Sequence, residues 1–107
     1  DYIYDHLHTR ITVELLAKRV NLTPSYLSRL FKKETGDNIG HYIKMLKLDT
    51  ARNMLIYSDY SPAQIAQTLA FPSQSYFTEQ FRLHTGLTPA NYRNINLRQT
   101  PFHKNNT

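Results

Sequence analysis

The stretch SYLSRLFKKETG, residues 25–36, decides the fold because it encodes a complete helix that the chain repeats fifty residues later. The second copy reads SYFTEQFRLHTG, residues 75–86, and keeps the first serine, two aromatic positions and the final glycine. A hydroxyl residue stands two positions before each copy, at Thr23 and Ser73, where its side chain can cap the helix N-terminus. The glycine suits a left-handed helix C-terminus. The sequence therefore predicts two equivalent helices with defined ends.

A shorter amphipathic helix is predicted before each copy, so the repeat covers a pair of helices. The first is VELLAKRV, residues 13–20, and the second is AQIAQTLA, residues 63–70. Ala17 and Ala66 are small residues at the points where the two helices of each pair would cross closely. This is a helix-turn-helix layout. An ordinary helical corner would explain one such pair, whereas two pairs in a basic chain favour DNA binding.

The whole chain is predicted to be all-α, with seven helices and no convincing strand. The expected parts are a short helix within residues 1–8, a first helix-turn-helix at about 12–36, a linker helix at about 38–57, a second helix-turn-helix at about 61–86 and a closing helix at about 88–95. Two helix-turn-helix subdomains joined by a long central helix would thus form one domain over residues 1–95. The polar, proline-broken segment 96–107 is predicted to be a flexible tail.

The composition limits the class of protein. The chain has 107 residues, of which 40% are hydrophobic, enough for one modest core. It has no cysteine, which excludes disulfides, a thiolate nucleophile and a cysteine zinc site. No apolar run approaches the roughly 18 residues of a membrane span, so we expect a cytoplasmic protein without membrane contact. Because the sequence opens on Asp1 rather than Met, we also expect an effector or dimerisation domain outside it.

The charge balance favours a polyanionic partner. Thirteen Lys and Arg residues against eight Asp and Glu residues give a net charge of +5. Residues 10–52 hold nine of the cations and four of the acids, whereas residues 53–107 hold four cations and two acids. The first repeat should therefore supply most of the electrostatic attraction.

The first repeated helix has two distinct sides. Helical spacing places Tyr26, Leu27, Leu30 and Phe31 on one side, which is the predicted core side. The other side carries short hydroxyls and long cations: Ser25, Ser28, Arg29, Lys32 and Lys33. A solvated helix face is the alternative explanation. The capped N-terminus, where the helix dipole favours a phosphate, argues for a binding face instead.

The second repeated helix keeps the inner side and changes the outer one. Tyr76, Phe77 and Phe81 are predicted to face inward, and the outer residues are Gln74, Ser75, Thr78, Glu79 and Arg82. Glu79 stands where the first copy has Arg29. An arginine can bind guanine with two hydrogen bonds, whereas a glutamate can only accept one from the amino group of cytosine. The two copies are therefore predicted to read different bases in an asymmetric site.

The linker helix has a suitable length for joining two DNA-reading helices. Its 19 or 20 residues span about 29 Å at about 1.5 Å per residue, and successive major-groove segments on one side of B-DNA lie about 34 Å apart. For its cations Lys44, Lys47 and Arg52, solvation or intramolecular pairing is favoured over contact with the DNA backbone.

These motifs resemble the DNA-binding domain of the AraC/XylS family of bacterial transcription regulators over roughly residues 1–95. The resemblance lies in LLAKRVNLTPSYLSRLFKKETG, YIKMLKLDTARNML and IAQTLAFPSQSYFTEQFRLHTGLTPANYR. It implies a seven-helix, two-lobed fold whose third and sixth helices lie in successive major grooves of double-stranded promoter or operator DNA.

The resemblance also assigns roles to single residues. The implied base-reading residues are Ser25, Ser28, Arg29, Gln74, Ser75, Thr78 and Glu79. The implied phosphate contacts are Thr23, Lys32, Lys33, Ser73 and Arg82. Arg93 either contacts a phosphate as well or ties down the closing helix.

The chain departs from the family pattern at four positions. Ala70 replaces a glycine before the phenylalanine of the second turn, where a left-handed backbone would cost an alanine about 1 kcal/mol. Lys47 stands where the family commonly has arginine. Leu83 replaces a residue that is often basic, and Glu79 one that is often arginine. The last two changes predict weaker DNA contacts by the second recognition helix.

Two other classes of function fit less well. A protein-interaction module would need exposed apolar anchors, and the first repeated helix offers cations instead; a contact with RNA polymerase is nevertheless compatible with DNA binding. An enzyme would need a catalytic or metal-binding cluster, yet His6 and His8 lie on nearly opposite helix faces and the remaining histidines have no acidic cluster nearby. We expect no catalytic residue, metal or cofactor. A non-specific DNA binder is the alternative closest to the main prediction.

Overall fold

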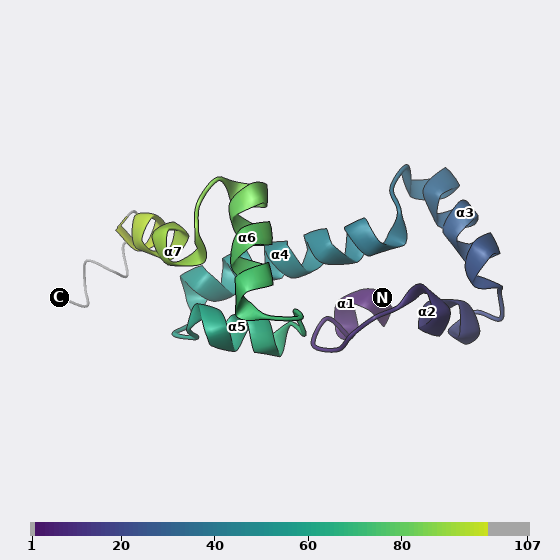
Figure 1. The fold of residues 1–107 in the computed structure, drawn as a ribbon, viewed down its shortest axis with the longest axis horizontal. Coiled ribbons are helices and arrows are strands. Elements are labelled where there is room, and N and C mark those ends of the chain that lie inside the picture. The colour runs from purple at the N-terminus through teal and green to yellow at the C-terminus, as the bar shows by residue number, and fades with distance from the viewer. Residues whose placement is uncertain (1, 99–107) are drawn as a thin grey trace. The chain divides into compact units, whose positions relative to one another are not determined.

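The computed structural model describes residues 2–98, and within that part of the chain all regular secondary structure is helical (Figure 1). Its seven helices are α1 (Tyr2–Asp5), α2 (Val13–Arg19), α3 (Pro24–Thr35), α4 (Ile39–Tyr57), α5 (Pro62–Thr68), α6 (Gln74–Thr85) and α7 (Pro89–Arg98). The predicted all-α class, helix number and helix order are confirmed. None of the helices in residues 2–98 is long and apolar enough to cross a membrane.

The chain forms two compact units, one ending at Lys47 and the other beginning at Leu48. The first contains α1, α2, α3 and the beginning of α4, and α2 packs against α3. The second contains the rest of α4 with α5, α6 and α7, and α6 packs against both α5 and α7 (Figure 1). Each unit therefore holds one helix-turn-helix, and α4 belongs to both.

The two recognition helices, α3 and α6, begin and end at the residues that the sequence predicts. The Thr23 hydroxyl oxygen accepts a hydrogen bond from the Tyr26 amide at 3.2 Å, and the Ser73 hydroxyl oxygen accepts one from the Tyr76 amide at 3.0 Å. At the other ends, a glycine with a φ of 79° follows α3 and one with a φ of 84° follows α6. Side-chain caps and left-handed glycines thus set both helix lengths.

The turns before α3 and α6 begin in the same way, although the second turn is one residue longer. The Leu22 amide donates to the Ala17 carbonyl, and the Phe71 amide donates to the Ala66 carbonyl, each at 2.9 Å. One residue in each turn has a left-handed backbone: Asn21 with a φ of 58°, and Ala70 with a φ of 57°. The strained conformation predicted for Ala70 is confirmed. The sequence analysis missed its counterpart, Asn21.

The second unit has the more completely buried core. Phe77 and Phe81 of α6 are both 0% exposed, as are Leu48, Leu55 and Ile65. Their rings lie 5.7 Å apart, edge to face. Leu48 is a core residue that the sequence analysis did not identify.

The first unit buries its α3 less completely. No residue of α3 is fully buried, and Leu27, Leu30 and Phe31 are half-buried. The prediction that Tyr26 and Tyr76 face inward is wrong in part, because Tyr26 is 47% exposed and Tyr76 is 41% exposed. Both lie at the edge of the apolar side, where a helix of about 3.6 residues per turn leaves a side chain only partly covered.

Two cations of α4 make contacts within the protein, as predicted. Lys47 is only 7% exposed, and its ammonium group donates to the Thr9 carbonyl at 3.1 Å. Burial disfavours the charged form and lowers the pKa of Lys47. Arg52 donates to the Tyr92 hydroxyl at 3.0 Å and lies 3.5 Å from an Asp49 carboxylate oxygen. Both cations are therefore engaged within the units that contain them.

The closing helix is longer than predicted. The sequence places its end near residue 95, whereas α7 continues to Arg98. Residues 96–98, predicted to begin a flexible tail, are helical, and the rest of that predicted tail, residues 99–107, lies outside the described residues.

Candidate nucleic-acid interface

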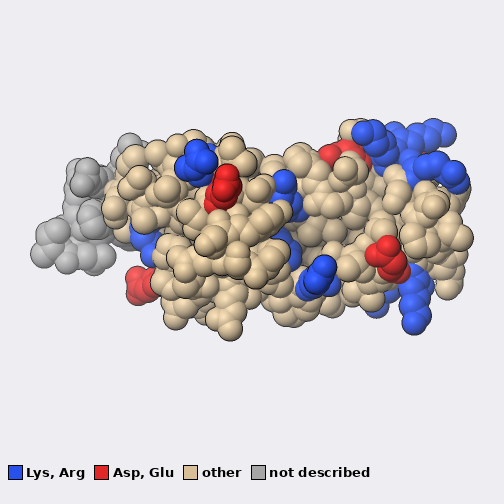
Figure 2. All heavy atoms as spheres, in the orientation of Figure 1, with Lys and Arg blue, Asp and Glu red and all other residues tan. Residues whose placement is uncertain are grey.

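The predicted binding residues of α3 are all exposed. Ser25, Ser28, Arg29, Lys32 and Lys33 lie on the outside of the first unit. On the face drawn in Figure 2, Lys and Arg side chains gather over α3. The apolar residues on the opposite side of the helix pack toward α2 and α4, which leaves this polar face free for a partner.

Ser28 lies at one edge of this polar face. It lines an open depression of about 320 Å³ together with Asn38, Ile39 and Gly40 at the start of α4. Its neighbour one turn along, Lys32, is not part of that depression. The structure thus places Ser28 closer to the body of the first unit than the sequence alone indicates, although it remains exposed.

The predicted binding residues of α6 lie together in one place. Gln74, Ser75, Thr78, Glu79 and Arg82 line a single open depression of about 310 Å³. Four of these side chains are exposed and Thr78 is half-buried. The α6 face is therefore a shallow polar surface on which hydroxyl, amide and charged groups are all available.

The charges of the two faces differ. The α3 face carries three cations, Arg29, Lys32 and Lys33, together with Ser25 and Ser28, and the exposed acid of α3, Glu34, is not one of these five residues. On α6 the Glu79 carboxylate lies 3.8 Å from the Arg82 guanidinium, so the only cation of that face stands next to an anion. Figure 2 shows blue and red side chains next to each other over α6. Because both partners are exposed, this pair is weak and can separate when a charged ligand approaches.

The helix caps leave hydrogen-bond donors available at the start of both recognition helices. Thr23 and Ser73 use their hydroxyl oxygens as acceptors for the caps. A hydroxyl group that accepts a hydrogen bond still has its own proton to donate. Both residues are exposed, so each can donate to a phosphate near the positive end of the helix dipole.

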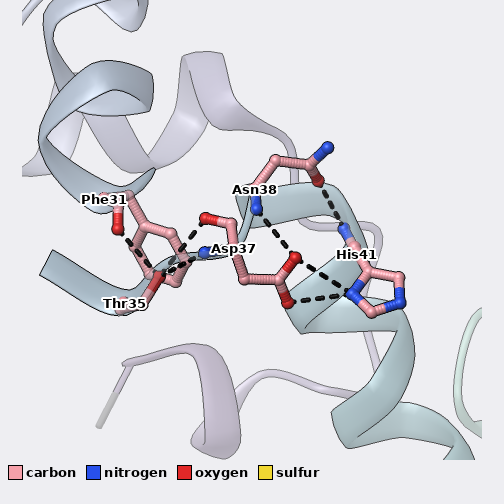
Figure 3. A network of polar contacts seen from close by, with 5 residues as sticks. All are labelled: Phe31, Thr35, Asp37, Asn38 and His41. Atoms are coloured by element: carbon pink, nitrogen blue, oxygen red, sulfur yellow. Dashed lines mark hydrogen bonds and ion pairs between the residues drawn. The ribbon is translucent and has the colours of Figure 1, made fainter. Parts of the chain in front are cut away.

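The end of α3 is held by a local hydrogen-bond network (Figure 3). The Thr35 hydroxyl donates to the Phe31 carbonyl at 2.8 Å and accepts from the Asp37 amide at 3.2 Å. The Asn38 side chain accepts from the His41 amide at 2.8 Å, and the Asp37 carboxylate lies 2.8 Å from the His41 ring nitrogen. The hydrogen bond from His41 holds the pKa of Asp37 below its usual value. This network fixes the point where α3 ends and α4 begins.

The second unit repeats this arrangement, with Thr88 in the place of Asn38. The Thr85 hydroxyl donates to the Phe81 carbonyl at 2.9 Å, and the Thr88 hydroxyl accepts from the Asn91 amide at 3.2 Å. A phenylalanine of each recognition helix contacts a tyrosine of the following helix edge to face. The pairs are Phe31 with Tyr42 and Phe81 with Tyr92, each with 5.2 Å between ring centroids.

Arg93 makes contacts that favour the structural role left open by the sequence. Its guanidinium group donates to the carbonyls of Leu55 at 2.8 Å and Ser58 at 3.2 Å, and to that of Tyr60. Arg93 thereby attaches α7 to the end of α4 and the loop that follows. A phosphate would have to compete with these three carbonyl contacts.

The histidines form no catalytic or metal-binding cluster among residues 2–98, where no group of three or more His, Cys, Asp or Glu side chains could hold a metal ion. His41 contacts the single carboxylate of Asp37, and His84 lies 3.3 Å from the carboxylate of Asp49. The first pair lies at the start of α4 and the second connects α6 with α4, so each has a structural explanation. His103 lies outside the described residues.

Comparison with known proteins gives one consistent family. A model described as a helix-turn-helix domain matches residues 16–95. The HTH-type transcriptional regulator YobQ of Bacillus subtilis is 38% identical over 93 residues, which make up 87% of this chain and 39% of YobQ. The multiple antibiotic resistance protein MarA of Escherichia coli is 31% identical over 97 residues, which make up 91% of this chain and 76% of MarA.

A solved structure is also similar over almost the whole chain. The DNA-binding domain of AdpA, a global transcriptional factor crystallised with a target DNA, has a TM-score of 0.89 and 29% sequence identity. The similarity covers 94% of this chain and 90% of the AdpA domain.

The fold and the two exposed faces define a helical protein with two helix-turn-helix motifs of the DNA-binding type. The chain belongs to the AraC/XylS family of transcription regulators and is the DNA-binding domain of that family. This membership also answers the enzyme alternative, because the family's members act as regulators. The chain spans well under half of the length of YobQ.

Proposed function

We propose that this domain binds specific double-stranded DNA sequences in promoters or operators and thereby regulates transcription. In this proposal α3 and α6 each read one of two successive major-groove segments. The observation that carries it is the presence of two matched helix-turn-helix motifs, each with a capped second helix whose polar face is exposed. Recognition helices of this kind enter the major groove with their N-terminal residues toward the bases.

The residue roles follow from position on the two helices. Base reading falls to Ser25, Ser28, Arg29, Gln74, Ser75, Thr78 and Glu79. Backbone contacts fall to Thr23, Lys32, Lys33, Ser73 and Arg82. Short hydroxyls let a helix approach base edges closely, and Lys or Arg side chains further along can reach phosphates. Arg93 belongs to this interface only if it gives up its contacts with the loop after α4.

The first unit is the stronger contributor in this proposal. Three cations on the α3 face would neutralise phosphates and release counterions. On α6, Arg82 has the Glu79 carboxylate beside it, which reduces its attraction for a phosphate. Glu79 itself suits a cytosine amino group. The bound sequence is therefore asymmetric.

The proposal extends to the whole protein. The protein acts in the cytoplasm, where a bacterial regulator binds the chromosome. An effector or dimerisation domain outside this chain controls the regulator, and a contact with RNA polymerase accompanies DNA binding.

Selection of bound duplexes from a random pool tests the proposed function. We expect the purified chain to enrich one asymmetric motif. Footprinting at two salt concentrations should then give protection over two adjacent turns on one side of the duplex, weaker at the higher concentration. Protection without any enriched motif would identify a non-specific DNA binder. Failure to bind any duplex would instead favour a protein-interaction module.

A further inference from the structure

Tyr26 and Tyr76 occupy matched positions and share an unexpected degree of exposure. Each is the third residue of its recognition helix, and the two are 47% and 41% exposed. Phe77, the next residue of α6, is 0% exposed. Phe77 therefore belongs to the core, whereas the exposed part of each tyrosine ring, at the edge of the apolar side, is available for an external contact.

The chemistry of the tyrosines supports an external contact. Neither hydroxyl has a hydrogen-bond partner among residues 2–98. The ring of Tyr76 lies 6.4 Å from the ring of Phe71 in the preceding turn, so its apolar body is supported by the protein. A tyrosine with a supported ring and an unpaired hydroxyl has a donor to offer to an external acceptor.

The position of the tyrosines on the helix indicates what that acceptor is. At about 3.6 residues per turn, Tyr26 lies about 100° around the helix from Ser25, on the flank that also carries Lys33 two turns later. The B-DNA major groove is about 12 Å wide, and a helix with its side chains is about 10–12 Å across. The flanks of a helix in the groove therefore lie against the sugar–phosphate strands.

We infer that the hydroxyl groups of Tyr26 and Tyr76 each donate a hydrogen bond to a DNA phosphate at the wall of the groove that their helix reads. This inference rests on the proposed function. The two faces differ in their base-reading residues and share these tyrosines, which fits contacts that position a helix without reading sequence. On α6 the flank position of Lys33 is taken by Leu83, so Tyr76 is the polar group that this flank offers near the start of the helix.

Binding measurements on Tyr26→Phe, Tyr76→Phe and the double variant test the inference. Each single change should weaken binding to the selected duplex about three- to tenfold, and the two losses should multiply. The slope of log affinity against log salt should stay unchanged, because no cation is removed. Lys32→Ala is the contrasting variant, since it should lower that slope by about one. Tyr57→Phe, at the end of α4, is the matched control and should bind like the wild type.

A duplex with one phosphate replaced by an uncharged methylphosphonate gives a second measurement. For each tyrosine, wild type should bind more weakly when the phosphate that this tyrosine contacts is replaced. The phenylalanine variant of the same tyrosine should bind that modified duplex as well as it binds the unmodified one. Binding equal to wild type in both phenylalanine variants would assign the tyrosines to packing alone and overturn the inference. A changed selected motif would overturn it too, by pointing to base contacts. If wild type binds no duplex, the proposed function itself fails, so the two failures are distinguishable.

Discussion

At the scale of single residues, Arg29 offers the most direct test of base reading. Arg29→Ala should weaken binding by about 1–3 kcal/mol and relax the preference at one base position, because a bidentate contact with guanine is lost. Repeating the duplex selection with the variant measures both effects. Lys33→Ala is the control, since loss of a phosphate contact should weaken all sequences alike and leave the motif unchanged. An unchanged motif with Arg29→Ala would contradict the assignment.

Ala70 carries backbone strain that a single substitution can relieve. Its φ of 57° lies in the left-handed region, which costs a residue with a Cβ about 1–2 kcal/mol. Glycine removes this cost but loses more conformational entropy on folding. Ala70→Gly should therefore raise the free energy of unfolding by about 0.5–1 kcal/mol, measured by urea denaturation.

Asn21 provides the matched control for this change. It has a φ of 58° in the equivalent turn, and asparagine tolerates the left-handed region better than alanine. Asn21→Gly should therefore stabilise less than Ala70→Gly. A destabilised Ala70→Gly variant would mean that the alanine methyl group contributes packing that outweighs the strain.

Local signals in the sequence predict some of these residues and not others. Asn21 aligns with Ala70 at the offset of 49 that relates the first helices of the two pairs, so the same alignment could have predicted its backbone. The role of Arg93 could not be predicted from local sequence, because the carbonyl groups that it contacts lie 33 to 38 residues earlier in the chain. The exposure of Tyr26 and Tyr76 likewise depends on how closely neighbouring helices approach, which helical spacing alone does not define.

At the scale of elements, helix ends were predictable wherever a cap was present. Thr23 with Gly36, and Ser73 with Gly86, gave the bounds of α3 and α6 to the residue. The end of α7 was predicted three residues early because no glycine follows it before Pro101. Leu48 in α4 was missed because α4 serves both units, and one apolar face cannot be assigned along its whole length.

Lys47 of α4 should make the stability of the fold depend on pH in the alkaline range. Burial lowers its pKa below the ordinary value of 10.5, so the folded state releases this proton at a lower pH than the unfolded chain. Between the two pKa values the unfolded state binds more protons, and the free energy of unfolding rises with pH.

Comparison with the Lys47→Met variant isolates the contribution of Lys47 to this pH dependence. The free energy of unfolding of wild type minus that of Lys47→Met should rise as the pH approaches 10.5 and level off above it. Urea denaturation of both proteins at a series of pH values gives the difference. A difference that stays constant over that range would mean that the burial of Lys47 has no effect on its ionisation in the folded state.

At the scale of the whole molecule, one scaffold is used twice for two different surfaces. The capped helices, the left-handed turns and the phenylalanine–tyrosine contacts recur in both units. The outer residues differ, with three cations on α3 and a paired glutamate and arginine on α6. The repeat in the sequence predicts the shared scaffold. The residues that differ between the two copies predict the different outer surfaces of α3 and α6. The degree of core burial in each unit was not predictable, because it depends on long-range packing.

The presence of two recognition helices in one chain predicts that binding requires a defined spacing between the two half-sites of the DNA. Inserting about five base pairs between the two half-sites turns one of them to the other side of the duplex, since B-DNA has about 10.5 base pairs per turn. The two recognition helices are joined through α4, a helix of 19 residues that is about 28 Å long at about 1.5 Å per residue. The proposed function requires both half-sites on one side of the duplex, so we expect affinity to fall to that of a single half-site.

An insertion of about ten base pairs restores the rotation but adds about 34 Å of distance. A helix cannot lengthen to cover that distance without losing its hydrogen bonds, so this duplex should also bind like a single half-site. Titration of the chain against the series of spacers measures both effects, with a duplex that keeps only the α3 half-site as the reference. Equal affinity for every spacer would mean that one helix-turn-helix does all of the binding, and the asymmetric charge of the two faces indicates that it would be the first.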